Sequence, residues 1–233
     1  MATYYAKRAL EILREEGPVE IYFSVYRKLN LFLSRISLMV DYSQKSIPST
    51  NRVYEVPVSD IDSYFGWTTV RRYFGGKIPA SPVWQGEWDN LETNDIYESY
   101  TYDSFADRFK YNKGWEQTNY YKKLTKDWRN ENKSHGEALR RLERYDDIYY
   151  DIKSNGFNIE YPIEVVITRN GEYIIWDGKH RFTIAKLLDL ESVPVEVRAV
   201  HSSWLKLRDE IHNNGLPEGY EDLRDHPDLQ DVL

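Results

Sequence analysis

The sequence of 233 residues contains no cysteine. This absence excludes disulfide bonds, thiolate metal sites and thiol nucleophiles. The sequence also lacks a run of about 18 uncharged apolar residues, the length that a membrane span requires. Its first residues, MATYYAKRALEILREEG, have neither the apolar core nor the small-residue cleavage site of a signal peptide. From these absences we expect a soluble, cytoplasmic chain.

An excess of positive charge is also missing. Lys and Arg number 31 against 38 Asp and Glu, which gives a formal net charge of -7. Proteins that bind the nucleic-acid backbone usually carry a net basic domain, so we do not expect nucleic acid to be the partner. Tyr and Trp are abundant, with 20 and 7 copies. Their rings suit an aromatic core as well as wet interfaces.

Residues 1–50 predict an amphipathic helical region followed by a linker. The stretches 4–16 and 19–40 both repeat apolar residues at helical spacing. The second stretch has a broad apolar face with basic residues beside it. Such a hairpin can pack on its own domain or on a second copy in a homodimer. It could alternatively attach residues 1–40 to the periphery of a membrane. The polar stretch 41–51 indicates the linker.

The middle of the chain predicts one strand and a largely helical stretch. Alternating side chains over residues 52–58 indicate a strand, and Pro57 places it at an edge or at its end. We expect a helix over 103–113 and further helices between 116 and 151, each charged on one side and apolar on the other. An acidic, turn-like GEWD element precedes them at residues 86–89.

The last third of the chain predicts alternating strands and helices. A helix that includes residues 145–154 ends at an Asn-Gly pair, which accepts the left-handed backbone conformation. An Asn-Gly turn joins strands over 162–168 and 173–176 into a hairpin, and a later strand spans 193–200. A helix that ends at residue 190 lies between this hairpin and the later strand.

The chain closes with a helix and an acidic tail. Ser202 or Ser203 is placed to cap a helix over residues 204–213. The tail covers residues 216–233, and it carries six acidic residues against one arginine. We expect this tail to be solvated and disordered.

The motif DGKHR, residues 177–181, joins the hairpin to the helix that follows. A strand, a glycine and a helix N-terminus form a phosphate-binding geometry, because the first-turn amides lack partners and carry partial positive charge. Arg181 offers a bidentate fork, and its neighbours add charge. The alternative is a structural Asp-Gly turn, and the GxGxxG and GxxxxGK[ST] loops are absent. The candidate phosphate-binding residues are Gly178, Lys179, His180, Arg181, Phe182 and Thr183.

The segment from Ile148 to Val197 resembles the ParB/sulfiredoxin fold. In that family, a helix that ends in glycine, a strand that begins Pro-Ile and a second strand lead into a Gly-x-His-Arg or Gly-x-Arg-Arg box. Here the box is GKHR, and the strand that follows reads Val-Pro-Val. The resemblance implies an α+β fold: a small mixed sheet with helices over residues 51–215, carrying a helical insertion at about 63–140 and preceded by the N-terminal hairpin.

The family includes sulfiredoxins, ParB clamps and kinases that phosphorylate free serine. Sulfiredoxins need a cysteine where this chain has Lys179, so their chemistry is excluded. ParB clamps follow the box with a helical DNA-binding domain, for which the acidic remainder of this chain is too short. The serine kinases carry an Asp-Gly-x-His-Arg box, which residues 177–181 match. The resemblance implies that Gly178, His180 and Arg181 contact a nucleotide phosphate.

We therefore expect a nucleotide-dependent phosphotransferase, a kinase that uses ATP, ADP or CTP with Mg²⁺. Its acceptor would be a small hydroxyl-bearing molecule or a glycan- or lipid-linked one. Asp177 and His180 are its candidate catalytic residues in the motif. Asp177 would bind Mg²⁺ or position the acceptor hydroxyl, and His180 would hold the nucleotide phosphates. In the kinase branch a glutamate ahead of the first family helix acts as the base, and Glu143 is better placed for that role here than Glu137.

Three residues outside the box are candidates for the acceptor pocket. Glu87 and Asp89 of the GEWD element could supply acceptor specificity or a second metal ligand, and His201 follows a strand end. Two alternatives to a kinase remain. One is a binding module that uses the nucleotide as a switch for dimerisation and hydrolyses it slowly. The other is a ParB-like nuclease or DNA-binding protein.

Overall fold

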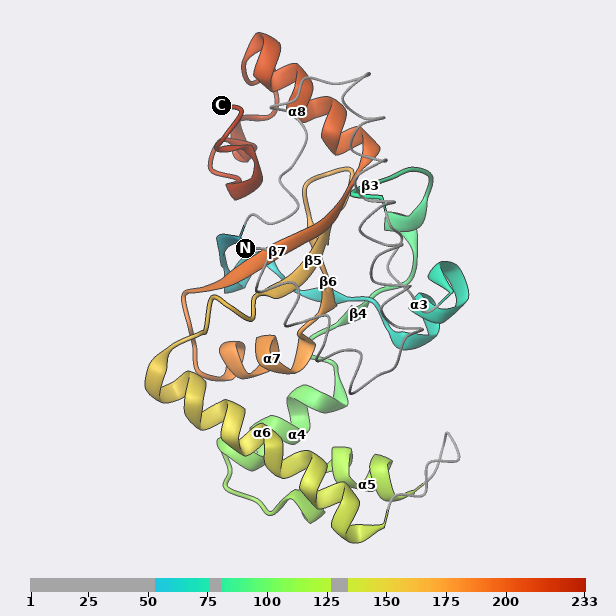
Figure 1. Cartoon of the computed structure of the whole chain (residues 1–233), viewed down its shortest axis with the longest axis vertical. Coiled ribbons are helices and arrows are strands. Elements are labelled where there is room, and N and C mark those ends of the chain that lie inside the picture. The colour runs from blue at the N-terminus through green and yellow to red at the C-terminus, as the bar shows by residue number, and fades with distance from the viewer. Residues whose placement is uncertain (1–52, 76–80, 127–133) are drawn as a thin grey trace, which may run out of the picture.

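A computed structural model of the chain describes residues 53–75, 81–126 and 134–233. Within these ranges it has six helices and a mixed sheet of seven strands, which confirms an α+β architecture (Figure 1). The predicted helical hairpin and the predicted linker lie outside the described residues.

The strands form one sheet in the order β1-β7-β5-β6-β2-β4, with β3 paired to β7. The β5–β6 hairpin is antiparallel, as predicted, and β5 runs parallel to β7 while β1 runs antiparallel to it. The strand bounds are β1 (Val53–Pro57), β2 (Ser63–Tyr64), β3 (Val83–Trp84), β4 (Asn94–Asp95), β5 (Ile163–Ile167), β6 (Tyr173–Asp177) and β7 (Ser192–His201).

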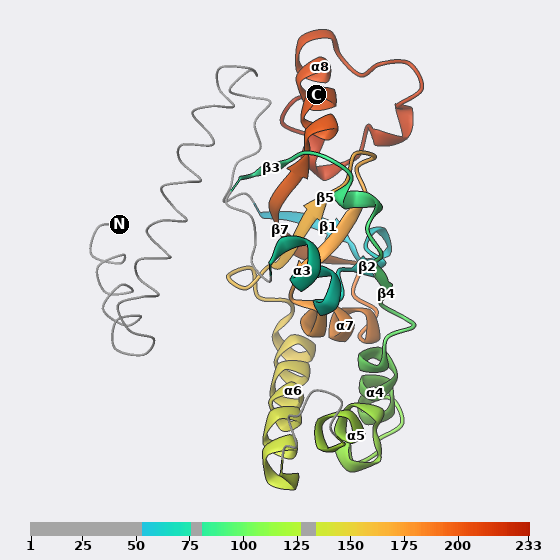
Figure 2. The same ribbon diagram turned by 90° about the vertical axis from the view of Figure 1, so that its right-hand side faces the viewer.

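Five of the six described helices lie at the two ends of the sheet, and α3 packs on one of its faces. Helices α4, α5 and α6 gather at one end and pack on one another, with α7 between them and the strands, whereas α8 lies at the opposite end (Figures 1 and 2). The inserted helices therefore belong to the same body as the α7 N-terminus. The helix bounds are α3 (Trp67–Phe74), α4 (Tyr100–Phe109), α5 (Asn119–Thr125), α6 (His135–Asn155), α7 (Lys179–Leu187) and α8 (Ser202–Asn214).

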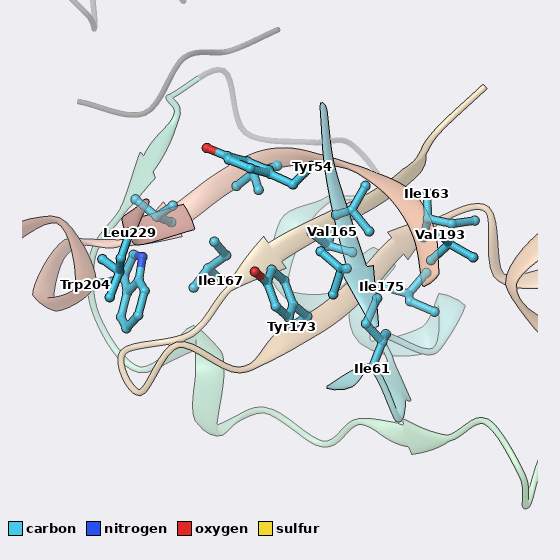
Figure 3. Packing of buried hydrophobic residues seen from close by; sticks show 14 of the residues in the cluster. Tyr54, Ile61, Ile163, Val165, Ile167, Tyr173, Ile175, Val193, Trp204 and Leu229 are labelled. Atoms are coloured by element: carbon cyan, nitrogen blue, oxygen red, sulfur yellow. The ribbon is translucent and has the colours of Figure 1, made fainter. Parts of the chain in front are cut away.

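Both faces of the sheet bury side chains, because successive residues of a strand point to opposite faces. On β5, Val165 and Ile167 belong to a core with Trp204 of α8 (Figure 3). Val166 between them belongs to an aromatic cluster on the other face, which includes Trp84 and Trp88. With both faces covered, the ends of the strands and the first turns of the helices are where a site can open.

The C-terminal tail is ordered, so the prediction of a disordered tail is wrong. Short 3-10 turns span Glu221–Leu223 and Pro227–Leu229, and Leu229 is fully buried. Asp228 is fully buried as well, and it accepts a hydrogen bond from Tyr54 at 2.8 Å and pairs with buried Arg208 at 3.0 Å. The acidic composition suggested disorder, but the buried Arg208 compensates the charge of Asp228 and lets this part of the tail pack against the core.

The cap of α8 also differs from the prediction. The residue before the helix is His201, whose Nδ1 accepts a hydrogen bond from the Ser203 amide at 3.0 Å. Ser202 is already the first helical residue. An imidazole with an unprotonated Nδ1 therefore fills the role that we expected of a serine hydroxyl.

Candidate phosphate-binding site

Gly178 forms the junction between β6 and α7. Its backbone is left-handed, with φ 88° and ψ 10°, and its amide donates to Asp177 Oδ1 at 2.7 Å. A Cβ at this position would lie 3.0 Å from Ile163 Cδ1 and 3.1 Å from Arg181 Nη2. Both the conformation and the crowding favour glycine at this position.

Only the first three amides of α7 remain for a ligand. The Phe182 amide already donates to Gly178 O at 3.0 Å, which leaves the amides of residues 179–181 without partners inside the helix. The Phe182 side chain is fully buried in the core, and Thr183 Oγ1 donates to Lys179 O at 2.9 Å. The two side chains thus stabilise the helix, and phosphate contact through Phe182 and Thr183 is not what the structure presents.

His180 points into the helical end of the molecule. Its ring stacks on Tyr145 of α6 at 4.7 Å between centroids and on Tyr120 of α5 at 5.8 Å. The Tyr120 hydroxyl lies 3.0 Å from His180 Nε2. Burial, with the nearby Lys179 charge, lowers the pKa of His180 to about 3. The imidazole is therefore neutral at pH 7, and it does not add the positive charge that the sequence suggested.

Arg181 is turned toward backbone carbonyls. Its Nη1 donates to Tyr161 O and, at 3.1 Å, to Pro162 O, both in the loop before β5. The guanidinium consequently holds this loop beside Gly178. In this arrangement Nη1 is not available for the bidentate phosphate contact that the sequence predicted.

Lys179, unlike Arg181, makes neither a hydrogen bond nor an ion pair through its side chain with any of the described residues. Its ammonium lies 4.4 Å from the centre of the Tyr64 ring and 5.5 Å from the centre of the Tyr100 ring. Among the described residues no carboxylate lies within ion-pair distance of it. Burial, together with the neighbouring charge of Lys123 on α5, lowers the pKa of Lys179 to about 8. A partly buried, unpaired cation beside a helix N-terminus is a setting that favours an anion.

Asp177 continues a row of carboxylates across three strands, which sequence reasoning missed. It lies opposite Glu164 on β5, which lies opposite Glu196 on β7. Arg198 bridges the two glutamates, and burial raises the pKa of Glu196. The residues that the structure describes contain no group of three acidic or histidine side chains that could hold a metal ion. A metal at Asp177 would thus need most of its ligands from the substrate.

The predicted bases lie on α6 but do not face the motif. Glu143 is exposed, and it lies about 160° around the helix from Tyr145, the residue that stacks on His180. Glu137 caps its own helix by accepting hydrogen bonds from Ser134 N at 2.9 Å and Ser134 Oγ at 2.8 Å. The residue one turn before Tyr145 is Arg141, a cation that adds to the lowering of the His180 pKa.

Glu87, Asp89 and His201 lie at the other end of the β5–β6 hairpin from the motif. Arg169, in the hairpin turn, pairs with Glu87 at 2.9 Å and with Asp89 at 2.7 Å. His201 Nε2 lies 2.9 Å from Gly86 O, so the three predicted pocket residues meet in one structural cluster. A cavity of about 270 Å³ adjoins it near Arg169, and another of about 360 Å³ lies beside α3. The predicted acceptor pocket and the DGKHR motif are thus separate.

Comparison of the chain with family models, with curated proteins and with solved structures found no match. None of the helices within the described ranges is long and apolar enough to cross a membrane.

Proposed function

We propose that this protein binds the phosphate groups of a nucleotide at the N-terminus of α7 and transfers phosphate to a hydroxyl acceptor. The observation that carries the proposal is Lys179, an unpaired and partly buried cation beside the unpartnered amides of a helix N-terminus. Phosphoryl transfer depends mainly on positioning and charge neutralisation, which such a site supplies.

The order of elements around the motif supports the proposal. A long helix ends at Asn155, its cap Gly156 has φ 79°, and β5, β6, α7 and β7 follow. The ParB/sulfiredoxin fold, which the sequence resembles here, has this order of elements. We propose the same fold for this chain, with the inserted helices packed against α7.

The transfer would break the bond between the terminal phosphorus and its bridging oxygen, and it would form a new bond to the acceptor oxygen. Asp177 is the carboxylate nearest the helix N-terminus in sequence, and one of its oxygens already accepts from the Gly178 amide. The other oxygen could accept the hydroxyl proton. Mg²⁺ is commonly held by one or two carboxylates plus substrate phosphates, a set that Asp177 fits.

The test is a thermal-shift panel of ATP, ADP and CTP with Mg²⁺ on the wild type and on Lys179→Ala. A ligand that binds only the folded chain raises its melting temperature. We expect one nucleotide to raise it in the wild type and to lose that effect in Lys179→Ala. Lys206→Ala, at an exposed position on α8, is the matched control and should respond as the wild type does. An equal shift in wild type and Lys179→Ala would contradict the proposal.

A second candidate is a nucleotide-controlled binding module. Neither Glu143 nor Glu137 faces the motif, and this observation favours a site that binds nucleotide without a strong base. Counting nucleotide consumed against phosphorylated acceptor separates the two. A kinase consumes nucleotide in proportion to product, whereas a switch hydrolyses slowly with no acceptor.

A further inference from the structure

Two lysines from different parts of the chain meet at one tyrosine ring. Lys123 Nζ, from α5, lies 3.7 Å from the centre of the Tyr100 ring, and Lys179 Nζ, from α7, lies 5.5 Å from the same centre. Tyr100 is the first residue of α4. Three helices therefore converge on a small basic cluster, which we call the Lys123–Lys179 pair.

The Lys123–Lys179 pair lacks a compensating charge. Among the described residues no carboxylate lies within ion-pair distance of either ammonium. The ring faces of Tyr64 and Tyr100 attract the cations, but they carry no net charge. The lowered pKa of Lys179, with Lys123 among its causes, agrees with this geometry. Two neighbouring cations without a counter-charge are most stable when an anion binds between them.

The pair also adjoins the amides of α7. Lys179 contributes to both sites: its backbone amide lies in the first turn of α7, and its side-chain ammonium group belongs to the Lys123–Lys179 pair. A ligand that contacts the first-turn amides and the ammonium groups at the same time needs more than one anionic group. Two linked phosphates meet this requirement, whereas a single anion does not.

We infer that Lys123 and Lys179 form a second phosphate subsite, so that the ligand carries a diphosphate whose other phosphate occupies the α7 N-terminus. The inference rests on the proposed function and extends it. The ligand class becomes a nucleoside diphosphate or triphosphate, and a monophosphate is excluded as the preferred ligand. The inserted helices supply a binding residue, Lys123.

Calorimetric titration with inorganic pyrophosphate and with orthophosphate tests the inference. The variants are Lys123→Ala and Lys122→Ala, the second being the adjacent exposed lysine on the same helix. We expect Lys123→Ala to weaken pyrophosphate binding at least tenfold and orthophosphate binding less than threefold. Lys122→Ala should change either by less than twofold, and Lys123→Arg should recover most of the pyrophosphate affinity. Melting curves of the free variants confirm that each is folded.

The inference is overturned if the wild type does not bind pyrophosphate, or if Lys123→Ala and Lys122→Ala bind it equally well. Its failure can be separated from failure of the proposed function. Pyrophosphate binding that depends on Lys123, without a thermal shift from any nucleotide, would uphold the diphosphate subsite and reject the nucleotide. A nucleotide shift that depends on Lys179 but not on Lys123 would do the reverse.

Discussion

Lys179 is in an unusual setting for a lysine, because its side chain is largely buried and the neighbouring charge of Lys123 is also positive. The folded chain therefore disfavours the ammonium form, and near pH 8 a substantial share of the side chain is the neutral amine. This amine is a better nucleophile than the ammonium forms of ordinary lysines, whose pKa is about 10.4. The pH at which the Lys179 amine becomes reactive therefore measures how strongly its surroundings lower its pKa.

We predict that Lys179 is acylated at lower pH than the other lysines. Competitive labelling with acetic anhydride, read by peptide mass spectrometry, should give a reactivity midpoint near pH 8 for Lys179. Lys123→Ala removes a like charge and should move the midpoint upward, whereas Lys122→Ala should leave it in place. A Lys179 that titrates together with the remaining lysines would contradict the prediction.

For single residues, the sequence predicted which residues matter at the motif better than it predicted where their side chains point. Gly178 and the charge of Lys179 follow from the motif itself, because a strand, a glycine and a helix start impose the geometry locally. The direction of His180 does not, since it depends on Tyr120, 60 residues away along the chain. Arg181 is likewise directed by the carbonyl of Tyr161, which no local pattern identifies.

Among the elements, the short 3-10 turn at Pro227–Leu229 is capped by a histidine. His226 Nδ1 accepts from the Asp228 amide at 3.2 Å, so its Nε2, 2.9 Å from Gly171 O, carries the proton and donates. Burial lowers the pKa of His226, although the Gly171 carbonyl and Asp228 oppose this and Arg208 adds to it. A proton on Nδ1 would remove the cap of the turn.

We predict that the free energy of unfolding falls with pH below about 6.5, the ordinary histidine pKa. The folded state keeps His226 neutral while the unfolded state takes up a proton, so the stabilisation is present above that pH and is lost toward the lowered folded pKa. Urea unfolding at pH 7.5 and pH 5.0 measures the fall. His226→Asn keeps a capping side chain without the titration, and it should lose less stability over this range. An equal loss in both proteins would reject this role for His226.

Element prediction succeeded where one pattern covered the whole element. The β5–β6 hairpin combines apolar strands with an Asn-Gly turn, and the structure has both strands within a residue of the predicted bounds. The tail failed because its order depends on one buried partner rather than on its own pattern. Five of the six acidic residues of the tail are exposed and one, Asp228, is buried against Arg208, and composition alone does not distinguish these two settings.

For the molecule as a whole, Asp228 connects the first described strand, the last helix and the tail. Its two oxygens accept from Tyr54 of β1 and from Trp204 of α8, both at 2.8 Å, and it pairs with Arg208. Figure 3 shows Tyr54, Trp204 and Leu229 gathered around this end of the sheet. Removing one partner of a buried ion pair leaves an uncompensated charge.

We predict that Asp228→Asn lowers the free energy of unfolding by about 3–5 kcal/mol, since Arg208 would be left buried without its full counter-charge. Asp225→Asn, at an exposed position in the same tail, is the matched control and should change it by less than about 0.5 kcal/mol. Urea unfolding at pH 7.5 measures both. Similar midpoints for the two variants would show that the tail is dispensable to the core.

The whole arrangement could be predicted only in part. The sequence indicates strands, helices and their order, but it does not show that α4 and α6 pack against α7 or that Tyr120 of α5 contacts His180 of α7. Those contacts join segments that are distant along the chain, and they bring Lys123 to the motif. The sequence therefore predicts only part of the candidate site. Gly178 and Lys179 belong to the motif itself, whereas Lys123 comes from the insertion and could not be assigned to the site from sequence.

The pairing of β1 with β7 has a consequence for how the chain folds during its synthesis. Val53 lies opposite Glu196, and Tyr54 bonds to a residue 174 positions later. On the ribosome, the segment that becomes β1 emerges long before β7, the strand with which it pairs among the described residues, has been made. Its apolar side must stay uncovered until residues 192–201 have been synthesised, so this part of the sheet closes at the slow rate of distant pairings. Between the synthesis of β1 and that of β7, the exposed apolar side of β1 would be a binding site for chaperones.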